Sequence, residues 1–392
     1  MQKRTILYVI TQGGPWGGAQ KYVADLAEGA QEKFLSIVAT GEPHGADDLQ
    51  KRLKDNPEID VIQLKHLRRD ISPLHDLLAV FEIRRLYKKL TPDIVHLNST
   101  KAGVIGSLAS YKLNAVPPTI IYTVHGWIFH EPMSLLKRSL YRMLERWTAR
   151  QKSKIIVLSE EDAQSGQHLG VPMHKLAVIP PGIERQQEIL SRHDARAALR
   201  EKTAADIPMD TPWIGTIANF FPTKGLDILL YAYDMRRDAL HRAQCVLIGD
   251  GPEAKNLTTK IQELNLSDCV HLTGFLPDAV KYLNAFDVFV LPSRKEGLPY
   301  ALLEAKLHGI PIIATDVGGT PSIIQDKETG RLVEKENPLE LGQAMVDAIT
   351  HPESSKAMAE SGMNDFPSRY YVRERMIEDT MALYSSVLRE GE

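Results

Sequence analysis

The sequence alternates short, strongly apolar runs with longer amphipathic segments from one end to the other. Such alternation is typical of βαβ units, in which parallel strands are covered by helices on both faces. We therefore expect an α/β protein with two doubly wound, Rossmann-like sheets in series. The predicted strands are Ile6–Ile10, Phe34–Ala39, Val61–Leu64, Ile94–Leu97, Thr119–Val124, Ile155–Leu158, Trp213–Ala218, Cys245–Ile248, Val270–Leu272, Val288–Leu291, Ile312–Thr315 and Arg331–Val333.

The length of the chain also favours two domains, because single hydrophobic cores stop growing near about 250–300 residues. The chain has 392 residues, and the turn-forming segment 180–182 separates the two sets of strands. We expect an N-terminal Rossmann-like domain at residues 1–183 and a C-terminal one at 184–371, facing each other across a cleft. A polar helix over residues 186–202 would lead into the second domain. The segment 372–392 has apolar side chains at helical spacing, so we expect a helix that packs back on the first domain.

The formal net charge of −3 conceals an asymmetry between the two predicted domains. Residues 1–183 contain 24 Lys and Arg against 18 Asp and Glu, a balance of +6, and the remaining residues contain 23 against 32, a balance of −9. The domains should therefore meet different partners.

Cysteine usage and hydropathy indicate the compartment. Cys245 and Cys269 lie in apolar, strand-like contexts, and no metal-ligand spacing such as C-x-x-C occurs. The run Ile6–Ile10 is too short for a signal peptide, and no stretch approaches the roughly 18 apolar residues of a membrane span. We expect a cytoplasmic protein in a reducing environment, without a bound metal, and leave open a peripheral position on the inner face of the cell membrane.

Two carboxylates frame the segment Glu296-Gly-Leu-Pro-Tyr-Ala-Leu-Leu-Glu304. It follows the predicted strand Val288–Leu291, at the edge of the sheet where open α/β sheets bind ligands. Pro299 can open a helix at its first position, which places Glu296 in the loop and Glu304 on the early helix. One carboxylate near a helix N-terminus can be only a cap, but two with Gly297 between them favour a binding site.

Other motifs also follow predicted strands. They are Gly13-Gly14-Pro-Trp-Gly17-Gly18-Ala19-Gln20, His125-Gly126, Ala218-Asn-Phe-Phe-Pro-Thr-Lys224-Gly225 and Ile248-Gly249-Asp250-Gly251-Pro252-Glu253. A glycine-rich turn that runs into a helix N-terminus is a ready anion site, because unpaired N–H groups point outward. The first of these loops lacks the G-x-G-x-x-G spacing, which counts against a dehydrogenase.

Together these motifs resemble the retaining glycosyltransferases of the GT-B fold, specifically glycosyltransferase family four, the nucleotide-sugar transferases with an E-x7-E motif. The resemblance covers nearly the whole chain, with the motifs in the family's order. It implies a hexosyltransferase that moves a hexose-type sugar, with retention, from a nucleotide diphosphate sugar held by the second domain to an acceptor held by the first. It further implies uridine diphosphate as the carrier and no cofactor.

The resemblance assigns roles to individual residues. In the family the first glutamate contacts hydroxyls of the donor sugar and the second holds the ribose, so these roles fall on Glu296 and Glu304. The turn Gly297-Leu298-Pro299 would present backbone N–H groups to the donor. Lys224 takes the place of the phosphate-binding lysine and would neutralise the leaving diphosphate. Where the family usually has an arginine, this chain has Asn219, which can donate a hydrogen bond but cannot replace a guanidinium.

His125 takes the place of a histidine that touches the donor sugar and would orient it. The predicted catalytic residues are thus His125, Lys224 and Glu296. We name no nucleophile, because the family is generally thought to react by front-face attack with the leaving phosphate as base. The further donor-binding residues implied are Gly17, Gly18, Gly249 and Gly251.

The stretch Lys137–Lys152 alternates cations with apolar side chains at helical spacing. It predicts an amphipathic helix that could lie on an anionic leaflet, where the first domain would reach a polyprenyl-linked sugar in a bacterial polysaccharide pathway. A core-packed helix with a solvated basic face is the alternative. No groove-reading or base-stacking motif of a nucleic-acid-binding protein appears.

Two other functions stay open on the sequence alone. One is a non-catalytic sugar-nucleotide-binding protein, against which the presence of Glu296, Lys224 and His125 argues. The other is a sugar-nucleotide epimerase of the GT-B fold, which lacks this glutamate spacing. A donor-hydrolysis assay separates an enzyme from a binding protein.

Overall fold

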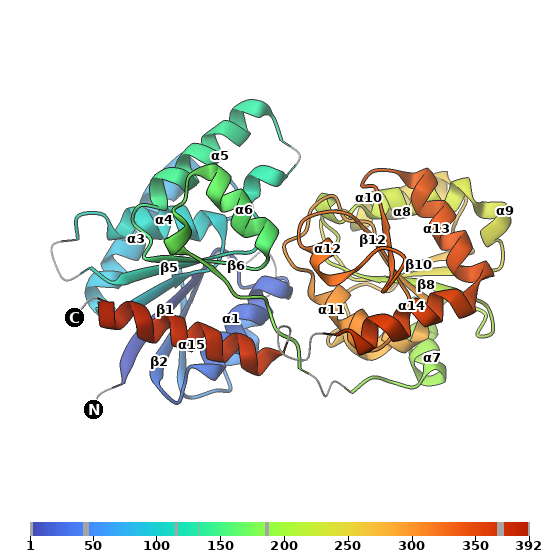
Figure 1. The fold of residues 1–392 in the computed structure, drawn as a ribbon, viewed down its shortest axis with the longest axis horizontal. Helices are drawn as coiled ribbons and strands as arrows, with labels where there is room; N and C mark the ends of the chain where they lie inside the picture. Colours follow the sequence, from blue (N-terminus) through green and yellow to red (C-terminus); the bar gives the residue numbers. More distant parts are fainter. Residues whose placement is uncertain are drawn as a thin grey trace. The chain divides into compact units, whose positions relative to one another are not determined.

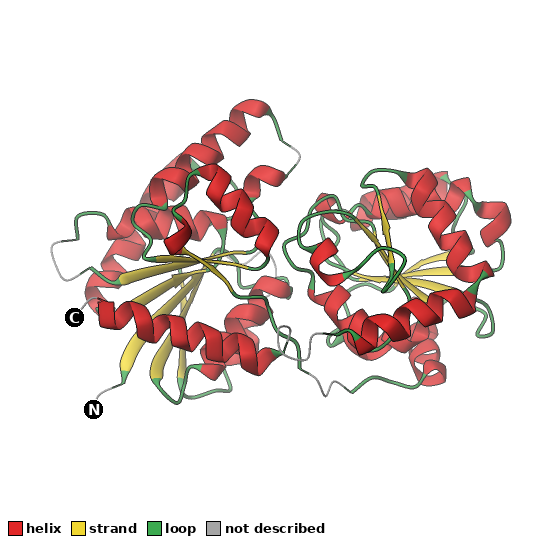
Figure 2. Ribbon diagram, viewed as in Figure 1, coloured by secondary structure: helices red, strands yellow, loops and turns green. Residues whose placement is uncertain are grey.

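The structure, a computed structural model, describes residues 3–41, 47–113, 117–131, 133–184, 188–366 and 372–390. The chain divides into two compact units, the first made of Met1–Gly182 with Val372–Glu392 and the second of Ile183–Tyr371. Each unit is a parallel β-sheet with helices on both faces (Figure 1, Figure 2). The predicted α/β class with two Rossmann-like sheets is confirmed.

The first unit has a seven-stranded sheet in the order β3-β2-β1-β4-β5-β6-β7. Its strands are β1 (Arg4–Ile10), β2 (Phe34–Thr40), β3 (Ile59–Gln63), β4 (Ile94–Leu97), β5 (Thr119–Val124), β6 (Lys154–Val157) and β7 (Leu176–Val178). Its helices are α1 (Gly18–Gly29), α2 (Asp48–Leu53), α3 (Pro73–Leu90), α4 (Thr100–Ser110), α5 (Leu135–Thr148), α6 (Glu160–Leu169) and α15 (Arg373–Glu390), with short 3-10 turns η1 (Ile128–His130) and η2 (Met173–Lys175).

Successive side chains of β1 point to opposite faces of this sheet. Leu7 and Val9 pack in a core cluster with side chains of α3 and α4. Tyr8 points to the opposite face, where its hydroxyl donates to the Leu26 carbonyl of α1 at 3.3 Å. Because both faces are covered, all of Ile6–Ile10 is buried, which explains why the strand is a continuous apolar run.

The C-terminal helix α15 packs against α1 (Figure 1). A Cβ on Gly29 of α1 would lie 2.6 Å from the Ile377 side chain, so the glycine lets the two helices approach closely. Arg373 adds hydrogen bonds to Asp25 at 2.8 Å and to Glu28 at 2.9 Å. The last segment of the chain therefore belongs to the first unit.

The second unit has a six-stranded sheet in the order β10-β9-β8-β11-β12-β13. Its strands are β8 (Trp213–Ile217), β9 (Gln244–Ile248), β10 (Val270–Leu272), β11 (Val288–Leu291), β12 (Ile312–Thr315) and β13 (Arg331–Val333). Its helices are α7 (Arg192–Thr203), α8 (Leu226–Met235), α9 (Arg237–Leu240), α10 (Ala254–Glu263), α11 (Tyr300–Leu307), α12 (Thr320–Ile323), α13 (Pro338–Thr350) and α14 (Pro352–Asn364), with 3-10 turns η3 (Pro222–Lys224) and η4 (Ala279–Ala285).

Buried side chains of its central strands, including Ile214, Leu247 and Val290, form one core cluster with α8, α10 and α13. Helices α11 and α14 pack against each other. The loops that carry the sequence motifs leave the carboxyl ends of β8, β9 and β11.

Every predicted strand is present, with ends within two residues of those expected. The structure adds β7, a half-exposed strand of three residues that no periodic pattern indicated. The polar helix expected over residues 186–202 is α7, which begins at Arg192 because the Ser191 hydroxyl caps the Asp194 N–H at 3.1 Å. Residues 185–187, within and beside that expected helix, lie outside the described residues.

Candidate functional site

Each sheet reverses its order of growth at one point, between β1 and β4 in the first unit and between β8 and β11 in the second. At such a point the connections run to opposite faces and leave a crevice outside the carboxyl ends of the strands, where ligands bind. The residues predicted from the motifs follow strands at or beside these two points: Gly17 and Gly18 after β1, His125 after β5, Asn219 and Lys224 after β8, Gly249 and Gly251 after β9, and Glu296 to Glu304 after β11.

In the second unit, Lys224 and Glu296 are in direct contact. The Lys224 Nζ donates to the Glu296 Oε1 at 2.7 Å, and the Ser293 hydroxyl donates to the same oxygen at 2.5 Å. The Glu296 side chain is 7% exposed and that of Lys224 is 23% exposed. The carboxylate is therefore enclosed, while the ammonium can be reached by an anion from solvent.

Arg294 ties together the two loops that carry this pair. Its guanidinium donates to both oxygens of Asp227, each at 2.8 Å, and to the Pro222 carbonyl at 2.8 Å. Its backbone N–H donates to the Thr223 carbonyl at 2.8 Å. The hydrogen bond with Asp227 raises the pKa of Arg294 despite burial. Burial alone would raise the pKa of Asp227, but the hydrogen bonds and charge of Arg294 lower it. Both partners are therefore charged at neutral pH.

Gly249 and Gly251 let the loops after β8 and β9 pack backbone to backbone. Both have positive φ, 145° and 156°. A Cβ on Gly249 would collide with the Ala218 carbonyl, and one on Gly251 would lie 2.7 Å from the Phe220 carbonyl oxygen. The Phe220 N–H also donates to the Asp250 carbonyl at 2.8 Å. These glycines thus set the course of the loop that contains Asn219.

The Gly318-Gly319 turn after β12 supports the loop after β11 in a similar way. The Gly319 N–H donates to the Gly297 carbonyl at 2.8 Å. A Cβ on Gly318, where φ is 53°, would collide with the Glu296 carbonyl oxygen. The backbone of Glu296 and Gly297 is therefore fixed by a neighbouring turn as well as by its own side-chain contacts.

Leu298 and Pro299 are buried, and Glu304 is half-buried on α11. Pro299 occupies the N-cap of α11, so the helix begins at Tyr300, one residue later than the sequence predicted. Glu296 lies in the loop and Glu304 in the second turn of the helix, as expected from their spacing.

In the first unit, Gly17 is the N-cap of α1 and Gly18 its first residue. No side chain of the described residues caps the N–H groups of this first turn, the arrangement in which a helix N-terminus receives an anion. The glycine-rich loop is braced by α2: the Leu49 N–H donates to the Gly13 carbonyl at 2.8 Å, and the Asp48 carboxylate accepts from the Trp16 N–H at 3.0 Å.

His125 packs edge to face on Tyr22 of α1, with ring centroids 5.0 Å apart. Its Nε2 is shielded from solvent and has no hydrogen-bond partner among the residues that the structure describes. Burial lowers the pKa of His125 to about 4, so the ring is neutral at neutral pH. A buried ring nitrogen with unmet hydrogen-bonding capacity is suited to a ligand hydroxyl.

A network of buried polar side chains lies behind His125. The His96 Nδ1 lies 2.6 Å from the Tyr384 hydroxyl of α15, and the His96 Nε2 lies 2.7 Å from the Thr123 hydroxyl. The Thr123 hydroxyl in turn lies 3.3 Å from that of Tyr22. Burial, and to a smaller extent the charge of His125, lower the pKa of His96 to about 3. The network connects the C-terminal helix to the ring on which His125 packs.

The sequence motifs did not indicate Arg294 or His96. The available signals were weak: Arg294 lies two residues before Glu296, and His96 is a polar residue inside an apolar strand. Their partners lie 67 and 288 residues away in the chain, so only the fold reveals the contacts.

Within the described ranges, no group of three or more His, Cys, Asp or Glu side chains is placed to hold a metal ion. In that same part of the chain, no helix has both the length and the apolar character needed to cross a bilayer.

Two family models match the chain. Residues 16–187 match the model described as Glycosyltransferase Family 4, and residues 199–365 match glycosyl transferases group 1. A relative from Escherichia coli, UDP-Gal:alpha-D-GlcNAc-diphosphoundecaprenol alpha-1,3-galactosyltransferase, is 30% identical over 274 residues, which is 68% of this chain and 69% of the relative.

Solved structures share the fold at lower identity. HepE from Anabaena in complex with UDP-glucose has a TM-score of 0.80 and 21% identity, over 97% of this chain and 99% of that one. A sucrose-phosphate synthase from Thermosynechococcus elongatus has a TM-score of 0.81 and 20% identity, over 99% of this chain and 100% of that one. At these identities the likeness shows the fold alone.

Proposed function

The chain belongs to glycosyltransferase family four and transfers a sugar from a nucleotide sugar in bacterial glycan assembly, and we propose three finer features of this reaction. The donor is a uridine diphosphate hexose, transfer retains the configuration at the anomeric carbon, and the acceptor is a lipid-linked saccharide. The observation that carries the part of the proposal on donor binding and transfer is the contact of Lys224 with Glu296 at the switch point between β8 and β11.

Donor binding redirects both members of this pair. The ammonium of Lys224 turns to the diphosphate, whose negative charge grows as its bond to the sugar breaks. The carboxylate of Glu296 then accepts hydrogen bonds from sugar hydroxyls, and such charge-assisted bonds are about twice as strong as neutral ones. Glu304 holds the ribose, and the neutral ring of His125 orients the sugar. Support for uridine comes from the UDP-Gal in the relative's name and from the UDP-glucose bound to HepE.

Retention without a covalent intermediate fits the surroundings of Glu296. Its Oε1 already accepts hydrogen bonds from Ser293 and Lys224, which makes this oxygen a poor nucleophile. In the front-face reaction the acceptor oxygen attacks the side from which the diphosphate leaves, and a phosphate oxygen takes the acceptor's proton. The part of this chain is to bind and orient both substrates and to stabilise the departing charge.

The acceptor proposal rests on the first unit and on the E. coli relative, whose name contains diphosphoundecaprenol. Helix α5 exposes Leu135 and Leu136 at 77% and 83%, and the cations Lys137 and Arg138 follow them directly in the chain. Each cation near an anionic surface contributes about 1 kcal/mol, so this helix attaches the unit reversibly to the inner face of the membrane.

A thermal-shift screen of UDP-, GDP- and ADP-hexoses tests the donor. A ligand at about 100 times its dissociation constant adds about 2.7 kcal/mol of apparent stability, so only the UDP-hexoses should shift the transition strongly. A shift with a GDP- or ADP-hexose alone would reject uridine. The anomeric coupling constant of the product, measured by NMR, tests retention, and an inverted product would reject it.

A further inference from the structure

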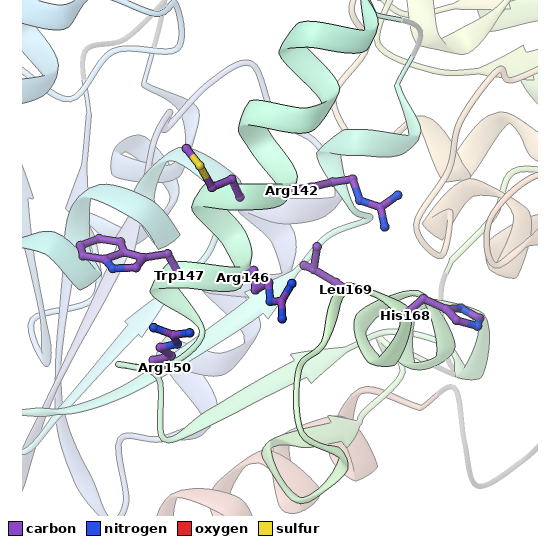
Figure 3. Close-up of a pocket in the computed structure, with 7 residues that line it drawn as sticks. Arg142, Arg146, Trp147, Arg150, His168 and Leu169 are labelled. Carbon is purple, nitrogen blue, oxygen red and sulfur yellow. The ribbon is translucent and has the colours of Figure 1, made fainter.

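A hollow of about 370 Å³ lies on the first unit between α5 and α6, and none of the residues assigned to the donor lines it. Ligand sites are typically about 300–1,000 Å³, so it has room for a small group. Figure 3 shows Arg142 and Arg146 on α5, Arg150 just beyond its end and His168 on α6. Met143, Trp147 and Leu169 complete the lining.

The arginines of this hollow are uncompensated. Arg142, Arg146 and Arg150 are exposed, and none forms an ion pair with a carboxylate of the described residues. The segment 133–152 contains six Lys and Arg and a single carboxylate, Glu145. That carboxylate is 1% exposed and is paired with Lys152 at 3.2 Å, so it does not neutralise the three arginines.

Apolar side chains line the same hollow beside the arginines. Met143 is 60% exposed and Trp147 is 39% exposed; Met143 lies three residues before Arg146, and Trp147 lies three residues before Arg150. Large apolar side chains left in water next to unpaired cations favour a ligand that has an anionic group and a hydrocarbon chain.

Arg146 of α5 is near Gly170, the left-handed residue that ends α6, since a Cβ there would lie 3.4 Å from the Arg146 Nε, in van der Waals contact. Just beyond the end of α5, the buried Lys152 has its Nζ 3.9 Å from the centre of the Tyr122 ring. The segment that carries the arginines is therefore held in the core of the unit at its end.

We propose that Arg142, Arg146, Arg150 and His168 bind the diphosphate group of the lipid-linked acceptor, and that Met143 and Trp147 contact the first part of its hydrocarbon chain. Guanidinium groups match phosphate oxygens in a bidentate manner, and two or three of them can share the two phosphates. This inference rests on the proposed lipid-linked acceptor and gives its diphosphate a site made of other residues than those assigned to the donor diphosphate.

The test is calorimetry on the full chain with farnesyl diphosphate, inorganic diphosphate and farnesol as probes, in the presence of saturating UDP. Farnesyl diphosphate should bind more tightly than inorganic diphosphate, and farnesol should not bind measurably. In the variant Arg142→Gln/Arg146→Gln/Arg150→Gln, the dissociation constant of farnesyl diphosphate should rise at least about tenfold, as expected for the loss of charge-assisted hydrogen bonds. The variant Trp147→Ala should bind farnesyl diphosphate more weakly than the wild type does, and inorganic diphosphate with the same affinity.

A matched control removes the same charge elsewhere on the first unit. Arg85→Gln/Lys88→Gln/Lys89→Gln on α3 should bind farnesyl diphosphate as the wild type does. Equal losses in the two triple variants, or displacement of the probe by UDP, would overturn the proposal. So would an arginine triple variant that loses binding to phosphatidylglycerol vesicles as much as to neutral vesicles that carry farnesyl diphosphate, because the three arginines would then recognise general lipid charge.

The same samples separate this inference from the proposed function. UDP-hexose binding is measured on each variant, and the arginine variants should keep it. Wild-type protein that binds farnesyl diphosphate but no UDP-hexose would reject the donor proposal and leave the site standing. Wild-type protein that binds UDP-hexose but not farnesyl diphosphate would reject the acceptor diphosphate site and leave the donor proposal standing.

Discussion

The Nζ of Lys224 lies 2.7 Å from the Oε1 of Glu296, although 72 residues separate them in the chain. The contact arises because β8 and β11 are neighbours in the sheet and the loops after them touch. A Cβ on Gly225, where φ is 62°, would collide with the Pro292 carbonyl. The turn that contains Lys224 therefore packs directly against the loop that leads to Glu296. The backbone thus places a cation and a carboxylate side by side before any donor binds.

Replacing Lys224 with Met removes the cation at the diphosphate. We expect kcat/KM to fall by about 10²–10³, the usual loss when one pre-placed group that stabilises transition-state charge is removed. Affinity for UDP should fall more than affinity for uridine. Steady-state kinetics and calorimetry measure both effects, with Lys255→Met on α10 as the matched control. Full activity in Lys224→Met would exclude the lysine from the mechanism.

Glu304→Ala removes the carboxylate expected at the ribose. The donor dissociation constant should rise by about tenfold, because one charge-assisted hydrogen bond contributes about 1.5–3 kcal/mol. Deoxyribose analogues of the donor should lose less affinity in this variant than in the wild type. Glu263→Ala, an exposed position on α10, serves as the control. An unchanged dissociation constant in folded Glu304→Ala would contradict the ribose assignment.

Arg294→Met separates the loop with Glu296 from the turn with Lys224. We expect the free energy of unfolding of the second unit to fall by about 1–2 kcal/mol, since the ion pair with Asp227 is partly exposed. Turnover should fall as well, although Arg294 is not expected to touch substrate. A double-mutant cycle with Asp227→Asn in urea denaturation measures the coupling. Additive losses would mean that the two side chains do not act together.

The stability of the first unit should fall as the pH falls from about 6.5 toward 4. Burial lowers the pKa of His125 to about 4 and that of His96 to about 3, so the unfolded chain binds more protons than the folded one in this range. Stability is therefore fully present above the pKa of the unfolded imidazole and is lost on acidification.

Thermal unfolding measured from pH 7 to pH 4 tests this dependence. His125→Gln should show a shallower loss than the wild type, whereas His241→Gln, which removes an exposed imidazole, should not. Equal slopes for His125→Gln and the wild type would show that the His125 ring is already hydrated in the folded state.

Tyr384→Phe removes the hydroxyl that meets His96 at 2.6 Å. The buried His96 Nδ1 loses its partner, so the first unit should be destabilised by about 1–3 kcal/mol. Urea unfolding checks this, with Tyr111→Phe, an exposed position, as the control. If the network also positions His125 through Tyr22, KM for the donor should rise while UDP affinity stays constant. If Tyr384→Phe had the same free energy of unfolding as the wild type, the His96 Nδ1 would have found another hydrogen-bond partner.

The sequence by itself determined the framework. The α/β class, the two sheets and the positions of the predicted strands follow from the alternation of apolar runs, because a parallel strand buried on both faces must be apolar throughout. It also marked Gly249 and Gly251 as part of a loop that follows a strand, because glycine is favoured in turns. These properties are local, so a local pattern reveals them.

Only the tertiary structure decided which of these elements meet. β7 has three residues and is visible only through its pairing with β6. The partners of Arg294 and His96 come from distant segments, and no periodicity encodes a contact between them. The hollow beside α5 is lined by the segments 142–150 and 168–169, which only the packing of α5 beside α6 brings together. Such contacts depend on how loops and helices pack around the sheets, and that packing is a property of the whole unit.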